Sequence, residues 1–159
     1  MIKVKSLEVR EIEYTYEQRP KINGMSDVVE AVKPMIADSN KEFFMALYLN
    51  TKNGILKQEV ISIGSLNANI VHPREIFKTA CMISASSIVV AHNHPSGDPT
   101  PSRQDIEITK KLFEAGKMMG IELLDHVIIG CDRNYGFKES GILQIIFYFR
   151  VIIWLIGLY

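Results

Sequence analysis

Residues 87–105 read SIVVAHNHPSGDPTPSRQD, and this stretch decides the fold. Residues 87–91 form a short apolar run rich in β-branched side chains, which is typical of a buried strand. The run leads directly into His92, Asn93 and His94. Because residues two apart on an extended chain point to the same side, the imidazoles of His92 and His94 can converge on one point.

The loop and the helix start that follow supply a carboxylate. Residues 95–101 are dense in Pro, Gly, Ser and Asp, so they can continue neither a strand nor a helix. Ser102 is a predicted N-cap, and Asp105 lies in the first turn of the helix that Ser102 opens. The two histidines, Asp105 and a water would complete a four-coordinate zinc site with one exchangeable position, as in catalytic zinc sites.

Each part of this pattern also has a simpler interpretation. An isolated His-x-His is more often a pair of structural histidines than a metal site. Ser102 and Asp105 could be no more than a capping pair, and Asp98 in Ser-Gly-Asp-Pro is predicted to be a turn residue. The whole pattern in one register favours the metal site: His-x-His, seven residues, Ser, two residues, Asp.

This pattern resembles the JAMM motif of the JAB/MPN metalloproteases, and AHNHPSGDPTPSRQD is closely similar to their RadC branch. The resemblance extends from about Glu42 to Leu143. It implies a JAB fold, in which helices flank a sheet, and a zinc-dependent peptidase or isopeptidase. It also implies that His92, His94 and Asp105 hold the Zn2+ ion.

In the JAMM pattern, a glutamate on an upstream strand beside the metal serves as the general base. By position this is Glu42, a carboxylate at the start of the apolar stretch EFFMALYL. Glu59 is the competing candidate, but its neighbours Lys57 and Gln58 are polar, which indicates an exposed position. The resemblance further implies that Ser102 donates a hydrogen bond to the oxyanion, a role that is compatible with capping the helix.

The composition limits the class of protein. A length of 159 residues, with 47% hydrophobic and 23% charged residues, fits one soluble α/β domain. The formal net charge of zero argues against broad nonspecific nucleic-acid binding, which needs an excess of Lys and Arg. Cys81 and Cys131 form no CxxC pair, and the N-terminus has no apolar signal region, so we expect a cytoplasmic protein.

Strands alternate with helices along the chain, which predicts an α/β fold built on a mixed sheet in a single domain. The expected strands span residues 4–16 at an edge, 42–49, 55–63 after an Asn-Gly turn, 87–91 and 121–129. The expected helices begin at Ser26 or cover residues 73–83 and 102–119. We predict a lead-in of residues 1–40, a JAB/MPN domain of residues 41–143 and an apolar tail of residues 144–159.

The end of the chain is far more apolar than the rest. Fifteen of the 18 residues from 142 to 159 are apolar, and Arg150 lies in the middle of them. A membrane-spanning helix needs about 20 apolar residues, and a central Arg costs roughly 2.5–3.5 kcal/mol on insertion. The tail therefore has three interpretations: docking on the domain, self-association with a second subunit, or peripheral or tail-anchored membrane contact.

Other functional classes share single features with this chain. The letters of residues 92–94 suggest an HNH nuclease, but that motif spreads its three residues over a ββα unit. Zinc deaminases need H-x-E and P-C-x-x-C, and the sequence has neither. Two alternatives stay open: a DNA repair-associated role, the historical label of RadC proteins, and an MPN binding module without hydrolytic activity.

The resemblance also bears on partners. RadC proteins typically have an N-terminal helix-hairpin-helix region, and these 159 residues lack one, so direct DNA binding is doubtful. A peptide or protein substrate is expected, but no insertion predicts which one.

Overall fold

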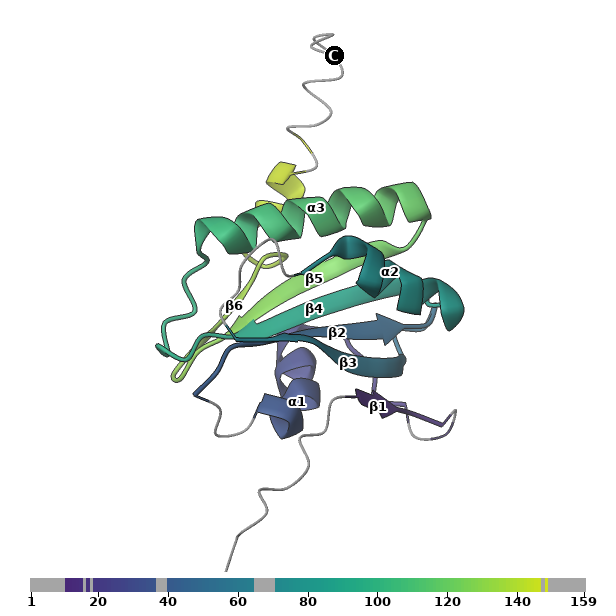
Figure 1. Cartoon of the computed structure of the whole chain (residues 1–159), viewed down its shortest axis with the longest axis horizontal. Coiled ribbons are helices and arrows are strands. Elements are labelled where there is room, and N and C mark those ends of the chain that lie inside the picture. Colours follow the sequence, from purple (N-terminus) through teal and green to yellow (C-terminus); the bar gives the residue numbers. More distant parts are fainter. Residues whose placement is uncertain are drawn as a thin grey trace, which may run out of the picture.

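The computed structural model describes residues 11–15, 17, 19–36, 40–64, 71–146 and 148. In this part of the chain, one six-stranded sheet is covered on one face by α1 and on the other by α2 and α3 (Figure 1). The elements in chain order are β1 (Glu11–Glu13), α1 (Met25–Ile36), β2 (Phe43–Leu49), β3 (Ile55–Ile63), α2 (Pro73–Met82), β4 (Ser87–Asn93), α3 (Arg103–Met119), β5 (Glu122–Ile129) and β6 (Asn134–Gly136). The predicted single α/β domain with a mixed sheet is confirmed.

The strand order places the motif at one end of the central strands. The sheet runs β1-β3-β2-β4-β5-β6, with β4 and β5 parallel and the other described pairs antiparallel. A parallel pair needs a crossover connection, and α3 supplies it between β4 and β5. Because β2 is antiparallel to β4, the start of β2 lies beside the end of β4, and Phe44 pairs with His92. Ligand sites in α/β folds commonly lie at this carboxyl end of parallel strands.

The core explains the apolar runs of β2 and of residues 88–91 in β4, since every residue of both strands is buried. Alternate side chains point to opposite faces of the sheet. One set, which includes Phe44 and Val90, packs with α2 and α3. The other set, which includes Met45 and Val89, packs with α1. A strand covered on both faces carries no polar alternation.

Several predicted elements need correction. Of the edge strand predicted over residues 4–16, residues 11–15 are described, and of these only Glu11–Glu13 form the edge strand β1. α1 begins at Met25 and is not capped by Ser26; instead the Asp27 carboxylate accepts hydrogen bonds from the N–H groups of Asn23 (2.7 Å) and Gly24 (3.3 Å). The short strand β6 was not predicted, because three residues are too few to show an alternating pattern.

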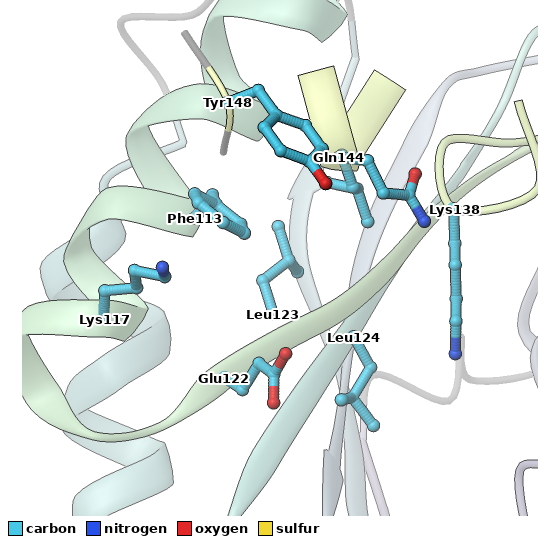
Figure 2. A pocket seen from close by; sticks show the side chains of 9 residues that line it. Phe113, Lys117, Glu122, Leu123, Leu124, Lys138, Gln144 and Tyr148 are labelled. Atoms are coloured by element: carbon cyan, nitrogen blue, oxygen red, sulfur yellow. The ribbon is translucent and has the colours of Figure 1, made fainter. Parts of the chain in front are cut away.

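The predicted apolar tail begins as part of the domain. Residues 142–146 are helical, and Leu143 and Ile146 belong to the core cluster that also contains Leu112 and Phe113 of α3. Figure 2 shows this region, where Phe113, Gln144 and Tyr148 line a pocket of about 300 Å³. Residues 147 and 149–159 lie outside the described residues. Within the described part, no helix is both long and apolar enough to cross a bilayer.

Truncating Leu143, the residue directly before the predicted tail, tests whether this end of the domain is docked on the core. Leu143 is 7% exposed, so Leu143→Ala should lower the free energy of unfolding by about 2–5 kcal/mol through lost burial and a cavity. Ile145 is 52% exposed, so Ile145→Ala should stay within about 0.5 kcal/mol of the unsubstituted protein. Denaturant unfolding measures both, and an equally small effect for the two variants would show that this segment is not docked in solution.

Candidate metal centre

Four side chains converge at the end of β4. Glu42, His92, His94 and Asp105, called here the four-residue cluster, each offer one ligand atom, and these atoms lie within 4.8 Å of one another. His92 lies near the end of β4, His94 directly follows that strand, and Asp105 comes from the first turn of α3. Glu42 directly precedes β2, and the antiparallel register brings it alongside. The structure thus brings together the three predicted ligands and the predicted base.

The distances within the four-residue cluster are short. Nε2 of His92 lies 3.0 Å from Nε2 of His94 and 3.2 Å from Oδ1 of Asp105. Nε2 of His94 lies 3.5 Å from Oδ2 of Asp105, and Oε1 of Glu42 lies 3.9 Å from Nε2 of His92. His92 and Asp105 are fully buried, whereas the side chains of His94 and Glu42 are each 16% exposed. The site is closed on the protein side and reachable from solvent beside His94 and Glu42.

Local structure orients His94 and Asp105. Nδ1 of His94 donates to the carbonyl of Asp98 at 2.7 Å, which leaves Nε2 of a neutral His94 as a lone pair. Ser102 caps α3 as predicted: its Oγ accepts from the N–H of Asp105, and its own N–H donates to Oδ2 of Asp105 at 2.7 Å. The Asp98 carboxylate accepts two bonds from Thr100, so Asp98 is the predicted turn residue. Capping the helix is therefore compatible with a role of Asp105 as a metal ligand.

The electrostatics of the four-residue cluster favour a cation. Burial alone would raise the pKa of Asp105, yet its interactions with His92 and His94 hold that pKa well below the usual range. The pKa of His94 is raised, chiefly by hydrogen bonding with Asp105. Oδ1 of Asp105 is buried and accepts no hydrogen bond from the described residues. A buried carboxylate oxygen facing imidazole nitrogens is a donor set that fits zinc.

Asn93 holds the backbone on either side of Glu42. Its Oδ1 accepts from the N–H of Phe43 at 2.8 Å, and its Nδ2 donates to the carbonyl of Lys41 at 3.0 Å. The amide thus continues the pairing of β2 with β4 beyond the last ladder pair, Phe44 with His92. Asn93 thereby fixes the position of Glu42 beside the histidines.

Removing the side-chain N–H donor of Asn93 should destabilise the protein. In Asn93→Asp, a carboxylate oxygen would face the Lys41 carbonyl, so the free energy of unfolding should fall by about 1–3 kcal/mol. Asn50 is the matched control, because its Oδ1 accepts from Lys52 and Gly54 and Asn50→Asp keeps both bonds. Urea unfolding compares the two variants. Equal stabilities would show that the bonds of Asn93 to residues 41 and 43 do not stabilise the protein.

The competing glutamate lies elsewhere. Glu59 is on β3 and accepts a hydrogen bond from the hydroxyl of Tyr48 at 3.1 Å. The expectation that Glu59 is exposed is wrong, since its residue is partly buried at the sheet. Tyr48 is fully buried, and burial followed by the charge of Glu59 raises its pKa. Glu59 satisfies a buried hydroxyl and does not belong to the four-residue cluster.

His126 is the residue of this centre that the sequence did not reveal. It lies on β5, is fully buried, and places Nε2 at 2.8 Å from Nδ1 of His92. Burial is the main cause that lowers the pKa of His126 well below its usual value. A lone histidine within IELLDHVII carries no sign of such a role, because its partner His92 lies on the adjacent strand β4.

A pocket of about 450 Å³ opens beside the exposed side of the centre. Its wall includes His94 and Pro95 from the motif loop and Gly130 and Cys131 after β5, together with Ile36, Asn40, Asn93 and Ile129. The pocket of Figure 2, at α3 and β5, shares no residue with the four-residue cluster. Space for a bound molecule therefore exists directly next to the candidate ligands.

Residues 22–142 match the family of RadC-like JAB domains. A UPF0758 protein of Methanococcoides burtonii is 56% identical over 128 residues, covering 80% of this chain and 56% of that protein. A UPF0758 protein of Methanosarcina mazei is 53% identical over 131 residues, covering 82% and 57%. A third, from Desulforamulus reducens, is 51% identical over 127 residues, covering 80% and 56%.

The part of the chain that matches these relatives includes the candidate metal centre. The chain spans just over half the length of the curated relatives it matches. The matched region contains the whole sheet from β2 to β6 and all of the four-residue cluster. Several relatives share more than half of their aligned residues with this chain, and the alignments cover about four fifths of it. The chain therefore belongs to the family of RadC-like JAB domains.

Proposed function

We propose that this chain is a zinc-dependent hydrolase of the JAMM type that cleaves an amide bond in a peptide or an isopeptide. His92, His94 and Asp105 would hold the zinc ion. The observation that carries the proposal is the convergence of two imidazole nitrogens and a buried carboxylate oxygen, with Glu42 beside them. Two histidines, a carboxylate and an open position are the ligand set of catalytic zinc.

Glu42 and Ser102 would supply the proton transfer and the hydrogen bond that the reaction needs besides the metal. When bound, zinc supplies Lewis acidity and lowers the pKa of water to about 7. Glu42 would take the proton of the attacking water and pass it to the leaving amine, because its side chain is partly exposed and lies 3.9 Å from His92. Ser102 Oγ accepts the N–H of Asp105 through a lone pair, so this bond leaves its hydroxyl hydrogen to be donated to the oxyanion.

The substrate would approach from the pocket beside His94. That pocket of about 450 Å³ is open and borders the exposed edge of the four-residue cluster. Two exposed cysteines without a disulfide, Cys81 and Cys131, suit a reducing compartment, so a cytoplasmic location is part of this proposal.

Zinc content and hydrolysis test the proposal together. The purified chain should carry about one equivalent of zinc, and it should release new amino termini from a defined peptide and isopeptide library. A protein that binds zinc yet cleaves nothing in the library, while retaining a peptide or protein partner, would favour an MPN binding module. Binding to duplex DNA without hydrolysis would favour the DNA repair-associated role. A protein without zinc affinity would refute the metal site itself.

A further inference from the structure

His126 lies within a chain of buried hydrogen bonds that runs from α3 to His92. The hydroxyl of Thr109 lies 2.5 Å from the carbonyl of Asp105, one turn earlier in the helix. A carbonyl oxygen can only accept, so Thr109 must donate its single hydroxyl hydrogen in this bond. Oγ1 of Thr109 also lies 2.6 Å from Nδ1 of His126. Since Thr109 has no further hydrogen, Nδ1 of His126 must be the donor.

The same reasoning fixes the next bond. With its hydrogen on Nδ1, a neutral His126 presents a lone pair at Nε2. Nε2 of His126 lies 2.8 Å from Nδ1 of His92, so Nδ1 of His92 must donate. Nε2 of His92 is then left as a lone pair, and it faces His94 and Asp105. Each step follows from donor counting along one path.

We propose that His126 is a positioning residue that holds His92 in the Nδ1–H tautomer, so that Nε2 of His92 is available as a metal ligand. This inference rests on the proposed function, in which His92 binds zinc. Ligating histidines usually donate their second ring nitrogen to a carboxylate, a carbonyl or a water. Here a second imidazole takes that place, and it depends in turn on Thr109.

The surroundings of His126 hold its ring in one orientation. The ring stacks on Phe137 with centroids 4.8 Å apart and planes 9° apart, and it meets Phe44 edge-on at 5.6 Å. His126 and Thr109 are both fully buried, so water does not compete for their hydrogen bonds. A merely packing role for His126 predicts that ring shape matters. The positioning role predicts that the acceptor at Nε2 matters.

Two substitutions separate these roles. His126→Phe keeps an aromatic ring against Phe137 and removes the acceptor, so the zinc affinity should fall about 10–100-fold. His126→Gln loses the ring but can place Oε1 near the position of Nε2, so its zinc affinity should stay close to that of the unsubstituted chain. Competition with a chromophoric chelator measures both affinities, and thermal unfolding monitored by circular dichroism checks that each variant folds.

The opposite ranking, or equal losses in the two variants, would overturn the positioning role in favour of packing. If His126→Phe does not fold, Thr109→Val and Thr109→Ser decide in its place. Thr109→Ser keeps the hydroxyl and should keep the zinc affinity, whereas Thr109→Val should lower it. Unchanged zinc affinity in a folded Thr109→Val would contradict the hydrogen-bond path.

The tautomers can be observed without metal, which separates this inference from the proposed function. Long-range proton–nitrogen NMR spectra of the metal-free chain at alkaline pH should show the hydrogen on Nδ1 of both His92 and His126. An Nε2–H tautomer at His92 would overturn the inference even if zinc binds. If the unsubstituted chain shows the expected tautomers but does not bind zinc, the proposed function fails and the hydrogen-bond path stands.

Discussion

Replacing His94 with alanine is expected to remove the bound zinc. His94 is one of three candidate protein ligands, and its Nε2 lies 3.0 Å from that of His92. Losing a direct ligand should weaken zinc binding by more than the roughly 10–100-fold caused by losing an outer partner. The zinc content of the purified protein should therefore fall from about one equivalent to almost none. Elemental analysis after dialysis against a mild chelator measures this change.

The matched control for His94 is a histidine outside the four-residue cluster. His72 precedes α2, is exposed, and makes no side-chain capping bond there. His72→Ala should keep the zinc content unchanged. Full retention of zinc in the double variant His92→Ala/His94→Ala would rule out the metal site. Equal losses in His72→Ala and His94→Ala would point to misfolding, which the thermal unfolding curve of each variant would reveal.

The motif could be predicted because its geometry is local. An extended chain places His92 and His94 on one side, and a cap at Ser102 places Asp105 in the first helical turn. The structure shows both features, with the capping box present at Ser102. Only 13 positions separate His92 from Asp105 along the chain, so short-range rules suffice.

The partners of the motif could not be predicted in the same way, because they depend on which strands are neighbours. His126 lies on β5, and nothing within its own strand shows that Val90, two residues before His92, is paired with it. Asn93 lies between the two histidines, where a metal interpretation leaves it without a role. Its bonds to residues 41 and 43 follow from the pairing of β2 with β4. Local periodicity carries no information about strand order.

The choice of Glu42 over Glu59 shows both sides of this limit. The motif resemblance selected Glu42, and the geometry places Glu42 in the four-residue cluster. The reason given against Glu59, an exposed position, was wrong, because Glu59 accepts a hydrogen bond from the buried Tyr48. Polar neighbours along one strand do not reveal what the adjacent strand offers.

Glu42→Gln is expected to retain zinc and to lose almost all hydrolysis. Glutamine keeps the size of the side chain but cannot take a proton, and general-base catalysis contributes about 10²–10⁴-fold. The rate of appearance of new amino termini from a cleaved library peptide should fall by that factor. Zinc content, measured on the same samples, should stay near one equivalent because His92, His94 and Asp105 are unchanged.

Glu59→Gln is the matched variant, since it makes the same chemical change on a neighbouring strand outside the four-residue cluster. It should keep the hydrolysis rate, because a glutamine oxygen can still accept from Tyr48. If Glu59→Gln is the inactive variant and Glu42→Gln is active, the base has been assigned to the wrong strand. If Glu42→Gln loses zinc together with activity, Glu42 acts as a fourth ligand of the metal. Its carboxylate already lies 3.9 Å from Nε2 of His92. Retained zinc with lost hydrolysis is the combination expected of a general base at Glu42.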